Sequence, residues 1–335
     1  MAMIVRLGYV AMSTEVKNAS PSKTMTATLF SQLNDREAAV RKLERIGAEN
    51  LHNTHRLLRH NRAYDIKVYR YSSKLIPLLG HDMLEGWDPI PALAAEFKEV
   101  GDYAKLHGMR TSFHPDHFTV LSTPRKDVLL KSYADLERHA AMLEAMGLGE
   151  DAKLNIHVGG TYGDKPKAAK RFVAHFADLN ESARRRLTLE NDDKTFTARE
   201  TLEICEKVGV PMVLDVHHHQ VNNEGEDILE LWPRIQATWE GQLCVSLPDS
   251  ADQPLPPKIH VSSPKNDKDI RSHADYVEAG PLLEFFRGIA GITPRLDVMI
   301  EAKMKDAALF RLMKDLEPEK GVDILTEASV QINVR

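Results

Sequence analysis

The sequence of 335 residues predicts an α/β protein built as a closed (β/α)8 barrel, or TIM barrel, in a single domain. Three observations predict this fold. Short apolar or β-branched runs alternate with amphipathic stretches along the chain, eight such runs occur, and polar side chains follow them where each run ends. Because the C-terminal ends of barrel strands meet at one mouth, these polar residues are expected to share one site.

The elements follow one another in the order that a barrel requires. The expected strands cover residues 4–10, 66–73, 109–115, 153–160, 186–192, 211–217, 258–264 and 296–303. Apolar residues at helical spacing predict helices between them, most clearly over 34–61, 92–108 and 125–147, and the last two end at glycine. We expect residues 1–316 to form the barrel and 317–335 a C-terminal tail that packs on it or is flexible.

Composition narrows the functional class. The net charge of -5 gives no global cationic field for nucleic acid, so a site for a polyanion has to be local. Two cysteines, Cys205 and Cys244, cannot build a disulfide framework or a thiolate zinc site. The first residues lack a signal-peptide pattern and no window has the ~18 apolar residues of a membrane span. We expect a cytoplasmic, monomeric protein without membrane contact.

Candidate metal ligands stand at the strand ends, and the histidine count of 15 is high for this length. The segment "LDVHHHQ" (214–220) carries three of these histidines, and taken alone it is explained equally well by a solvated loop. Six consecutive exits, however, carry a histidine or a carboxylate: His114, His157, Glu190, Asp215 with His218, His260 and Glu301. These ligand types hold Mn(II), Zn(II) or Fe(II), so the series favours a metal centre over six unrelated loop residues.

The charge of such a centre indicates a substrate class. Glu190, Asp215 and Glu301 would be costly to bury together without cations. Three divalent cations would supply six positive charges against these three negative ones. The pocket would then attract a phosphodiester although the whole chain is acidic.

Nine motifs, in this order, resemble those of the UV damage endonucleases, metal-dependent DNA repair enzymes on a barrel related to xylose isomerase and apurinic endonuclease. The motifs are "RLGYV", "VYRYSSKLIP" followed by His81, "SFHPDHF", "NIHVGG", "LENDDKTFT", "LDVHHH", "KIHVSSPK", "RSHADYV" and "MIEAKMKD". The resemblance extends from residue 4 to about residue 316, which is nearly the whole chain.

The resemblance implies a metal centre of up to three ions, usually manganese. The implied metal ligands are His114, His157, Glu190, Asp215, His218, His260, His273 and Glu301. The implied catalytic residues are Glu190, Lys258 and His81, the last as a further ligand or a neighbour of the scissile phosphate. The implied contacts to the lesion or to DNA are Tyr9, His117, Phe118, Lys265, Lys268 and Arg271. His117 stands where the family usually has glutamine, and a solvated loop explains each of the three basic residues equally well.

The implied activity is a nick in damaged double-stranded DNA immediately 5′ of cyclobutane dimers, 6-4 photoproducts and abasic sites. Attack by a metal-activated hydroxide would leave a 3′-hydroxyl and a 5′-phosphate. Three alternatives stay open: a sugar isomerase or epimerase on a similar barrel, an apurinic endonuclease inactive on photoproducts, and an inactive DNA-binding relative. The histidines at 114, 157, 260 and 273 favour a centre of three metals over the sugar enzymes, and the complete ligand set argues against the inactive relative.

Overall fold

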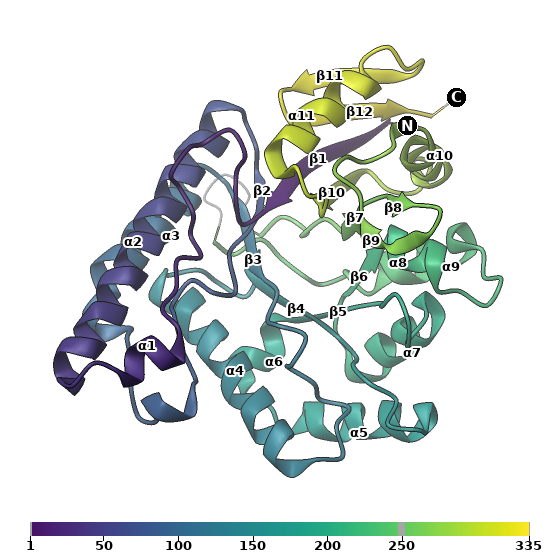
Figure 1. Cartoon of the computed structure of the whole chain (residues 1–335). Helices are drawn as coiled ribbons and strands as arrows, with labels where there is room; N and C mark the ends of the chain where they lie inside the picture. Colours follow the sequence, from purple (N-terminus) through teal and green to yellow (C-terminus); the bar gives the residue numbers. More distant parts are fainter. Residues whose placement is uncertain (1, 247–251, 335) are drawn as a thin grey trace.

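The computed structural model describes residues 2–246 and 252–334, and it contains the closed parallel barrel that the sequence predicts (Figure 1). Ile4–Tyr9 of the first strand pair in parallel with Arg295–Ile300 of the last, which closes the barrel. The eight barrel strands are β1 (Ala2–Val10), β2 (Val68–Arg70), β3 (Arg110–Phe113), β4 (Lys153–His157), β5 (Leu187–Glu190), β6 (Met212–Asp215), β7 (Lys258–Val261) and β10 (Arg295–Ile300).

Helices surround the barrel, as Figure 1 shows. The longer ones are α2 (Arg36–Ala63), α3 (Ala94–Leu106), α4 (Lys126–Ala145), α5 (Lys165–Ala177), α7 (Ala198–Val208), α9 (Ile228–Ala237), α10 (Ala279–Ile289) and α11 (Lys305–Leu316). The short ones are α1 (Ala27–Ser31), α6 (Glu181–Arg186), α8 (Val216–Val221) and the 3-10 turns η1 (Asp82–Leu84) and η2 (Pro91–Leu93). The three clearest predicted helices correspond to α2, α3 and α4. Gly108 and Gly147, with φ of +61° and +67°, follow α3 and α4 in the left-handed region that favours glycine.

Several strands are shorter than predicted, and most of the difference falls at their C-terminal ends. The prediction over 66–73 contains only Val68–Arg70 as strand, and the one over 211–217 ends at Asp215. Val216–Val221 forms α8 instead, whose first turn is capped by the Asp215 carboxylate, which accepts a hydrogen bond from the His218 backbone at 2.7 Å. The histidine run is therefore a helical turn at the mouth, and all three imidazoles in it are buried.

Two hairpins were not predicted. One, β8 (Pro264–Asn266) and β9 (Asp269–His273), projects from the exit of β7 and is called the exit hairpin below. The other, β11 (Val322–Thr326) and β12 (Ser329–Asn333), lies in the C-terminal tail. There, β12 pairs antiparallel with Ala2–Arg6 of β1, while β2 pairs with Gly8–Val10. The tail thereby covers an edge of β1 that would otherwise expose unpaired backbone groups, and both termini lie close together (Figure 1).

Apolar side chains fill the layer between the strands and the helices, whereas part of the barrel interior is polar. Leu7, Phe172 and Trp232 are among the fully buried apolar residues. Inside the barrel, Asp297 of β10 forms ion pairs of 2.7 Å with both Arg6 and Arg110. Within the two described ranges, none of the helices is both long and apolar enough to cross a membrane.

Candidate metal centre

Four of the predicted ligands surround the carboxylate of Glu190 at the end of β5. Nε2 of His114 lies 3.3 Å from Oε2 of Glu190, and Nδ1 of His260 lies 3.1 Å from the same oxygen. The ligand atoms of His114, His157 and Glu190 all lie within 4.8 Å of one another, as do those of Glu190, Asp215 and His260. Both groups contain Glu190, so this carboxylate would contribute to the binding of a cation by either group.

The other predicted ligands continue this cluster. Nδ1 of His218 lies 3.7 Å from Oε1 of Glu190. Nδ1 of His260 lies 2.9 Å from Oε1 of Glu301, and His273 contacts the Glu301 backbone. All eight predicted ligands thus belong to one contiguous group at the barrel mouth, which is called the ligand cluster below.

Four histidines of the ligand cluster are oriented in the same way by backbone carbonyl groups. Nδ1 lies at hydrogen-bond distance from such an oxygen in His114 (Pro115, 2.9 Å), His157 (Glu190, 3.3 Å), His218 (Asn191, 2.9 Å) and His273 (Glu301, 2.9 Å). Since a carbonyl oxygen only accepts, Nδ1 carries the hydrogen and Nε2 of each neutral ring keeps its lone pair. Metal-binding histidines are commonly held in this manner.

Buried polar atoms without partners also mark the cluster. Among the described residues, Nε2 of His260 and Oδ2 of Asp215 have no hydrogen-bond partner, although both residues are fully buried. Buried polar groups in folded proteins are nearly always satisfied, so these atoms need an explanation. Coordination to divalent cations would satisfy them, and the residues present therefore fit a metal site.

The electrostatics of the cluster lead to the same conclusion. Burial, together with the charges of Glu190 and Glu301, raises the pKa of Asp215 to about 7. Burial lowers the pKa of His218, but the carboxylates of Asp215 and Glu190 outweigh it and raise that pKa to about 9. A cluster without cations would therefore hold extra protons, which binding of divalent cations would displace.

A layer of polar side chains lies directly beneath the ligands, because residues two apart on a strand face the same side. Ser112, Asn155, Thr188 and Lys258 precede His114, His157, Glu190 and His260, respectively, by two residues. The Asn155 amide donates a hydrogen bond to Oε2 of Glu190 and accepts one of 2.8 Å from the Thr188 hydroxyl. Nζ of Lys258 donates to Oγ of Ser112 at 3.1 Å. This layer holds the ligands in place from below.

Burial in this layer changes the acidity of Lys258. Its side chain is buried, and burial together with the nearby Arg110 and Arg70 guanidinium groups lowers the pKa of Lys258 to about 7. The amine can thus gain or lose a proton near neutral pH.

Sequence reasoning missed two residues that contact the ligands. Arg70, at the end of β2, forms an ion pair with Oε1 of Glu301, and Asn155 contacts Glu190. Arg70 lies in the quoted "VYRYSS" run and Asn155 in "NIHVGG", so the period of two along each strand was the available signal.

Two predicted site residues make other contacts in the structure. His81 is exposed, and its Nδ1 accepts a hydrogen bond of 3.2 Å from the Met83 backbone rather than contacting the ligand cluster. Tyr9 is fully buried, and its hydroxyl donates to Asn61 of α2 at 2.8 Å. The expectation that Tyr9 lies beside damaged nucleotides is therefore corrected: its ring packs between barrel and helix and presents no surface to DNA.

The predicted DNA contacts lie on two loops at the mouth. Phe118 has 73% of its surface exposed, and the ring of His117, which is also exposed, packs against it with a centroid separation of 4.0 Å and a tilt of 39°. Lys265, Lys268 and Arg271 are exposed on the exit hairpin.

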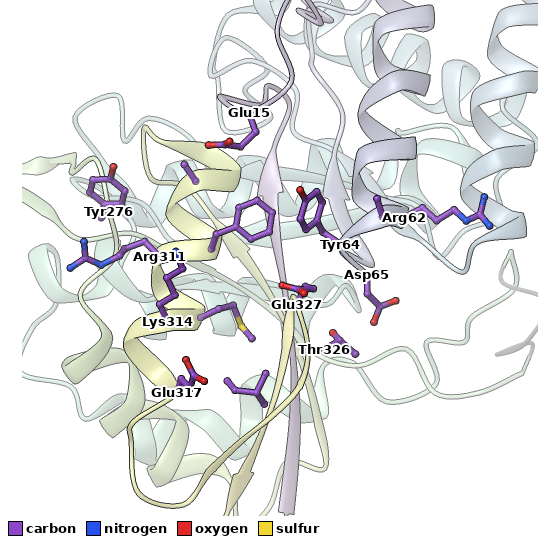
Figure 2. Close-up of a pocket in the computed structure, with 15 residues that line it drawn as sticks. Glu15, Arg62, Tyr64, Asp65, Tyr276, Arg311, Lys314, Glu317, Thr326 and Glu327 are labelled. Carbon is purple, nitrogen blue, oxygen red and sulfur yellow. The ribbon is translucent and has the colours of Figure 1, made fainter.

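Two cavities differ in their relation to the ligand cluster. A cavity of about 210 Å³ is lined by His114, His157 and Asp192 and opens at the mouth. A larger one, of about 970 Å³, lies outside the barrel between α2, α11 and the tail, as Figure 2 shows with Tyr64 and Lys314 on its walls. Its acidic and basic residues nearly balance and no predicted ligand lines it, so the larger cavity is not the site for a phosphodiester.

Several known proteins are similar to this chain in sequence, in fold or in both. The model of a family described as UV-endonuclease UvdE matches residues 5–333. A UV DNA damage endonuclease from Halalkalibacterium halodurans is 44% identical over 332 residues, covering 99% of this chain and 100% of the relative. The crystal structure of SacUVDE is 27% identical with a TM-score of 0.79, covering 94% of this chain and 98% of that one. Endonuclease IV from Thermus thermophilus, 14% identical with a TM-score of 0.52 and coverage of 79% and 95%, shows a similar fold alone. The chain therefore belongs to the UV-endonuclease UvdE family.

Proposed function

We propose that the protein is a metal-dependent endonuclease that nicks double-stranded DNA immediately 5′ of UV photoproducts and of abasic sites. The products would carry a 3′-hydroxyl and a 5′-phosphate. Family membership supports a DNA repair endonuclease that acts on UV damage and decides against the sugar isomerase alternative. The single observation that supports the metal dependence is the convergence of six other predicted nitrogen and oxygen ligands around Glu190 and Glu301.

Divalent cations, up to three and in our proposal Mn(II), would activate water and neutralise the phosphate when bound in this cluster. The residues present would hold them with His114, His157, Glu190, Asp215, His218, His260, His273 and Glu301. Glu190 occupies the centre, where it is shared by two groups of ligands. Arg70 neutralises part of the charge of Glu301 from the second strand, which keeps that carboxylate ionised and able to bind a cation.

Lys258 would serve the reaction from beneath the ligands. Its lowered pKa, about 7, lets its amine take up or release a proton during the reaction near neutral pH. His81 is exposed on the loop after β2, and we propose that it contacts the DNA beside the scissile phosphate.

Recognition of the lesion would use the exposed aromatic residue at the mouth. Damaged bases stack poorly, so bending the DNA and displacing them costs less free energy than for intact pairs. Phe118 would fill the vacated space and His117 would supply hydrogen bonds, while Lys265, Lys268 and Arg271 would contact phosphates.

The test is a cleavage assay on an end-labelled duplex that carries one cyclobutane dimer, with Mn(II). We expect one nick at the 5′ side of the dimer and none in the undamaged duplex. An abasic duplex in a parallel reaction separates an apurinic endonuclease, which would cut that substrate alone. Absence of cleavage in both damaged duplexes, with metal bound, would refute the proposal.

A further inference from the structure

The exit hairpin is joined to the ligand cluster through one buried histidine, His217. Its Nε2 lies 2.6 Å from the backbone oxygen of Ile270, in β9 of the exit hairpin. Its Nδ1 lies 2.7 Å from Oγ of Ser262, which follows β7. His217 is fully buried and precedes the predicted ligand His218. Figure 1 shows α8, which carries His217, beside β9.

The partners of His217 fix the position of its hydrogen atom. A backbone carbonyl only accepts hydrogen bonds, so Nε2 carries the hydrogen and donates it to Ile270. Nδ1 of the neutral ring then accepts a hydrogen bond from the Ser262 hydroxyl. The ring is thus turned opposite to the four ligand histidines, whose Nδ1 atoms face carbonyl groups, and both of its nitrogens are occupied by protein. His217 is consequently unsuited to bind a metal in this arrangement.

The exit hairpin carries functional residues but few anchors. Its surface presents Lys265, Lys268 and Arg271, and its last residue is the predicted ligand His273. Two further hydrogen bonds hold β9. Arg271 donates to the backbone oxygen of Asp193 at 3.1 Å, and Nδ1 of His273 contacts the backbone oxygen of Glu301. The ring of His217 also packs edge-on against that of His273, with a centroid separation of 5.6 Å.

We infer that His217 is a positioning residue that fastens the exit hairpin to the metal centre, so that the phosphate contacts and the ligand His273 keep a fixed relation to each other. Its effect on DNA rests on the proposed function, whereas its effect on the hairpin does not. The hydrogen bond to Ile270 is the essential link, because among the described residues it is the hydrogen bond by which the imidazole holds the backbone of β9.

Two substitutions distinguish the hydrogen bond to Ile270 from the other contacts of the His217 imidazole. In His217→Gln, the side-chain amide nitrogen can occupy the position of Nε2 and still donate to Ile270. In His217→Asn, the shorter side chain can reach only the position of Nδ1, next to Ser262. His55→Ala is the control, since His55 lies on α2 and pairs with Glu99 outside the barrel.

The first readout needs no DNA. Trypsin cleaves after Lys265, Lys268 and Arg271, and mass spectrometry follows the rate at these bonds alone. We expect His217→Asn to raise this rate about fivefold to tenfold, the effect of one lost hydrogen bond, and His217→Gln to stay within about twofold of wild type. Equal rates in wild type and His217→Asn would overturn the inference. If His217→Asn does not fold, Ser262→Ala takes its place. This substitution removes the hydrogen bond to Nδ1 of His217 and should raise the cleavage rate about twofold, and an unchanged rate would overturn the inference.

The second readout is binding to the dimer-containing duplex at several salt concentrations. We expect His217→Asn to weaken binding about fivefold to tenfold and to reduce the slope of log K against log salt by about one, with rescue in His217→Gln. Faster proteolysis of the exit hairpin in His217→Asn together with unchanged DNA binding would refute the role of His217 in positioning the phosphate contacts. A wild-type protein that fails to nick the dimer would refute the proposed function, and the proteolysis would still decide the inference.

Discussion

The side-chain amide of Asn155, on β4, donates a hydrogen bond to Oε2 of Glu190, on the neighbouring strand β5. The same oxygen lies 3.3 Å from His114 and 3.1 Å from His260. Asn155 thus orients the carboxylate that both groups of predicted ligands share. Partners of metal ligands typically contribute measurably to metal affinity although they touch no metal themselves.

Asn155→Leu should therefore weaken metal binding. The leucine side chain has a similar size but cannot donate to Glu190, so the carboxylate loses its orientation. We expect the affinity for Mn(II) to fall about tenfold to 100-fold, as measured by isothermal titration calorimetry. Thr188→Val is the matched control, because Thr188 contacts Asn155 but not the carboxylate, and a smaller effect is expected. Equal effects of both substitutions would speak against this role of Asn155.

Phe118→Ala should impair recognition of damage without affecting stability. The ring is 73% exposed, so its removal loses little packing in the folded protein. Stacking of an aromatic ring on a base contributes about 1–3 kcal/mol, so binding to a dimer-containing duplex should weaken about fivefold to 100-fold. Leu130→Ala, at an exposed residue on α4, is the control, and fluorescence anisotropy is the measurement. Unchanged affinity of Phe118→Ala would remove this residue from the proposed interface.

Asp297 should make the stability of the barrel depend on pH in the acid range. Burial raises its pKa, but the Arg6 and Arg110 guanidinium groups outweigh burial and lower it to about 2. An unfolded aspartate has a pKa of about 3.9, so this group stabilises the fold above that pH and loses its contribution as the pH falls toward 2. Asp297→Asn should lower the free energy of unfolding at pH 7 by about 3 kcal/mol or more, because Arg110 remains buried without its partner.

Urea unfolding at several pH values measures this contribution. The difference between wild type and Asp297→Asn should be largest at neutral pH and shrink below about pH 4. Asp127→Asn serves as the comparison, since Asp127 pairs with Arg125 on the surface and should matter little. A difference that stays constant down to the acid limit would show that Asp297 acts through packing rather than charge.

The barrel and the ligand cluster could be predicted because one geometric rule connects them. Parallel strands of a closed barrel all end at the same mouth, so Glu190 and Glu301 both lie beside His260 there, although they are 111 positions apart in the sequence. Asn155 could have been found in the same way, since it precedes His157 by two residues and shares its face of β4.

The direction of its side chain explains why Tyr9 does not lie where it was predicted. Arg6 faces the barrel interior, where it pairs with Asp297, so Tyr9, three residues later, faces the helices. The alternation along β1 thus argued against placing Tyr9 in the site. The exit hairpin has no apolar alternation to reveal it, because its strands are short and exposed, and its position depends on contacts such as that of His217. His81 follows an irregular loop, for which no periodicity sets the direction of a side chain, and its role in the site stays a prediction.

The central claim, that these residues gather divalent cations around Glu190, is tested most directly by a metal count. Elemental analysis of the protein equilibrated with Mn(II) and freed of excess metal gives the number of ions per chain. We expect two to three ions in the wild type and at least one fewer in Glu190→Gln, with both proteins equally folded by circular dichroism. Less than one ion per chain in the wild type, or an identical count in Glu190→Gln, would contradict the account.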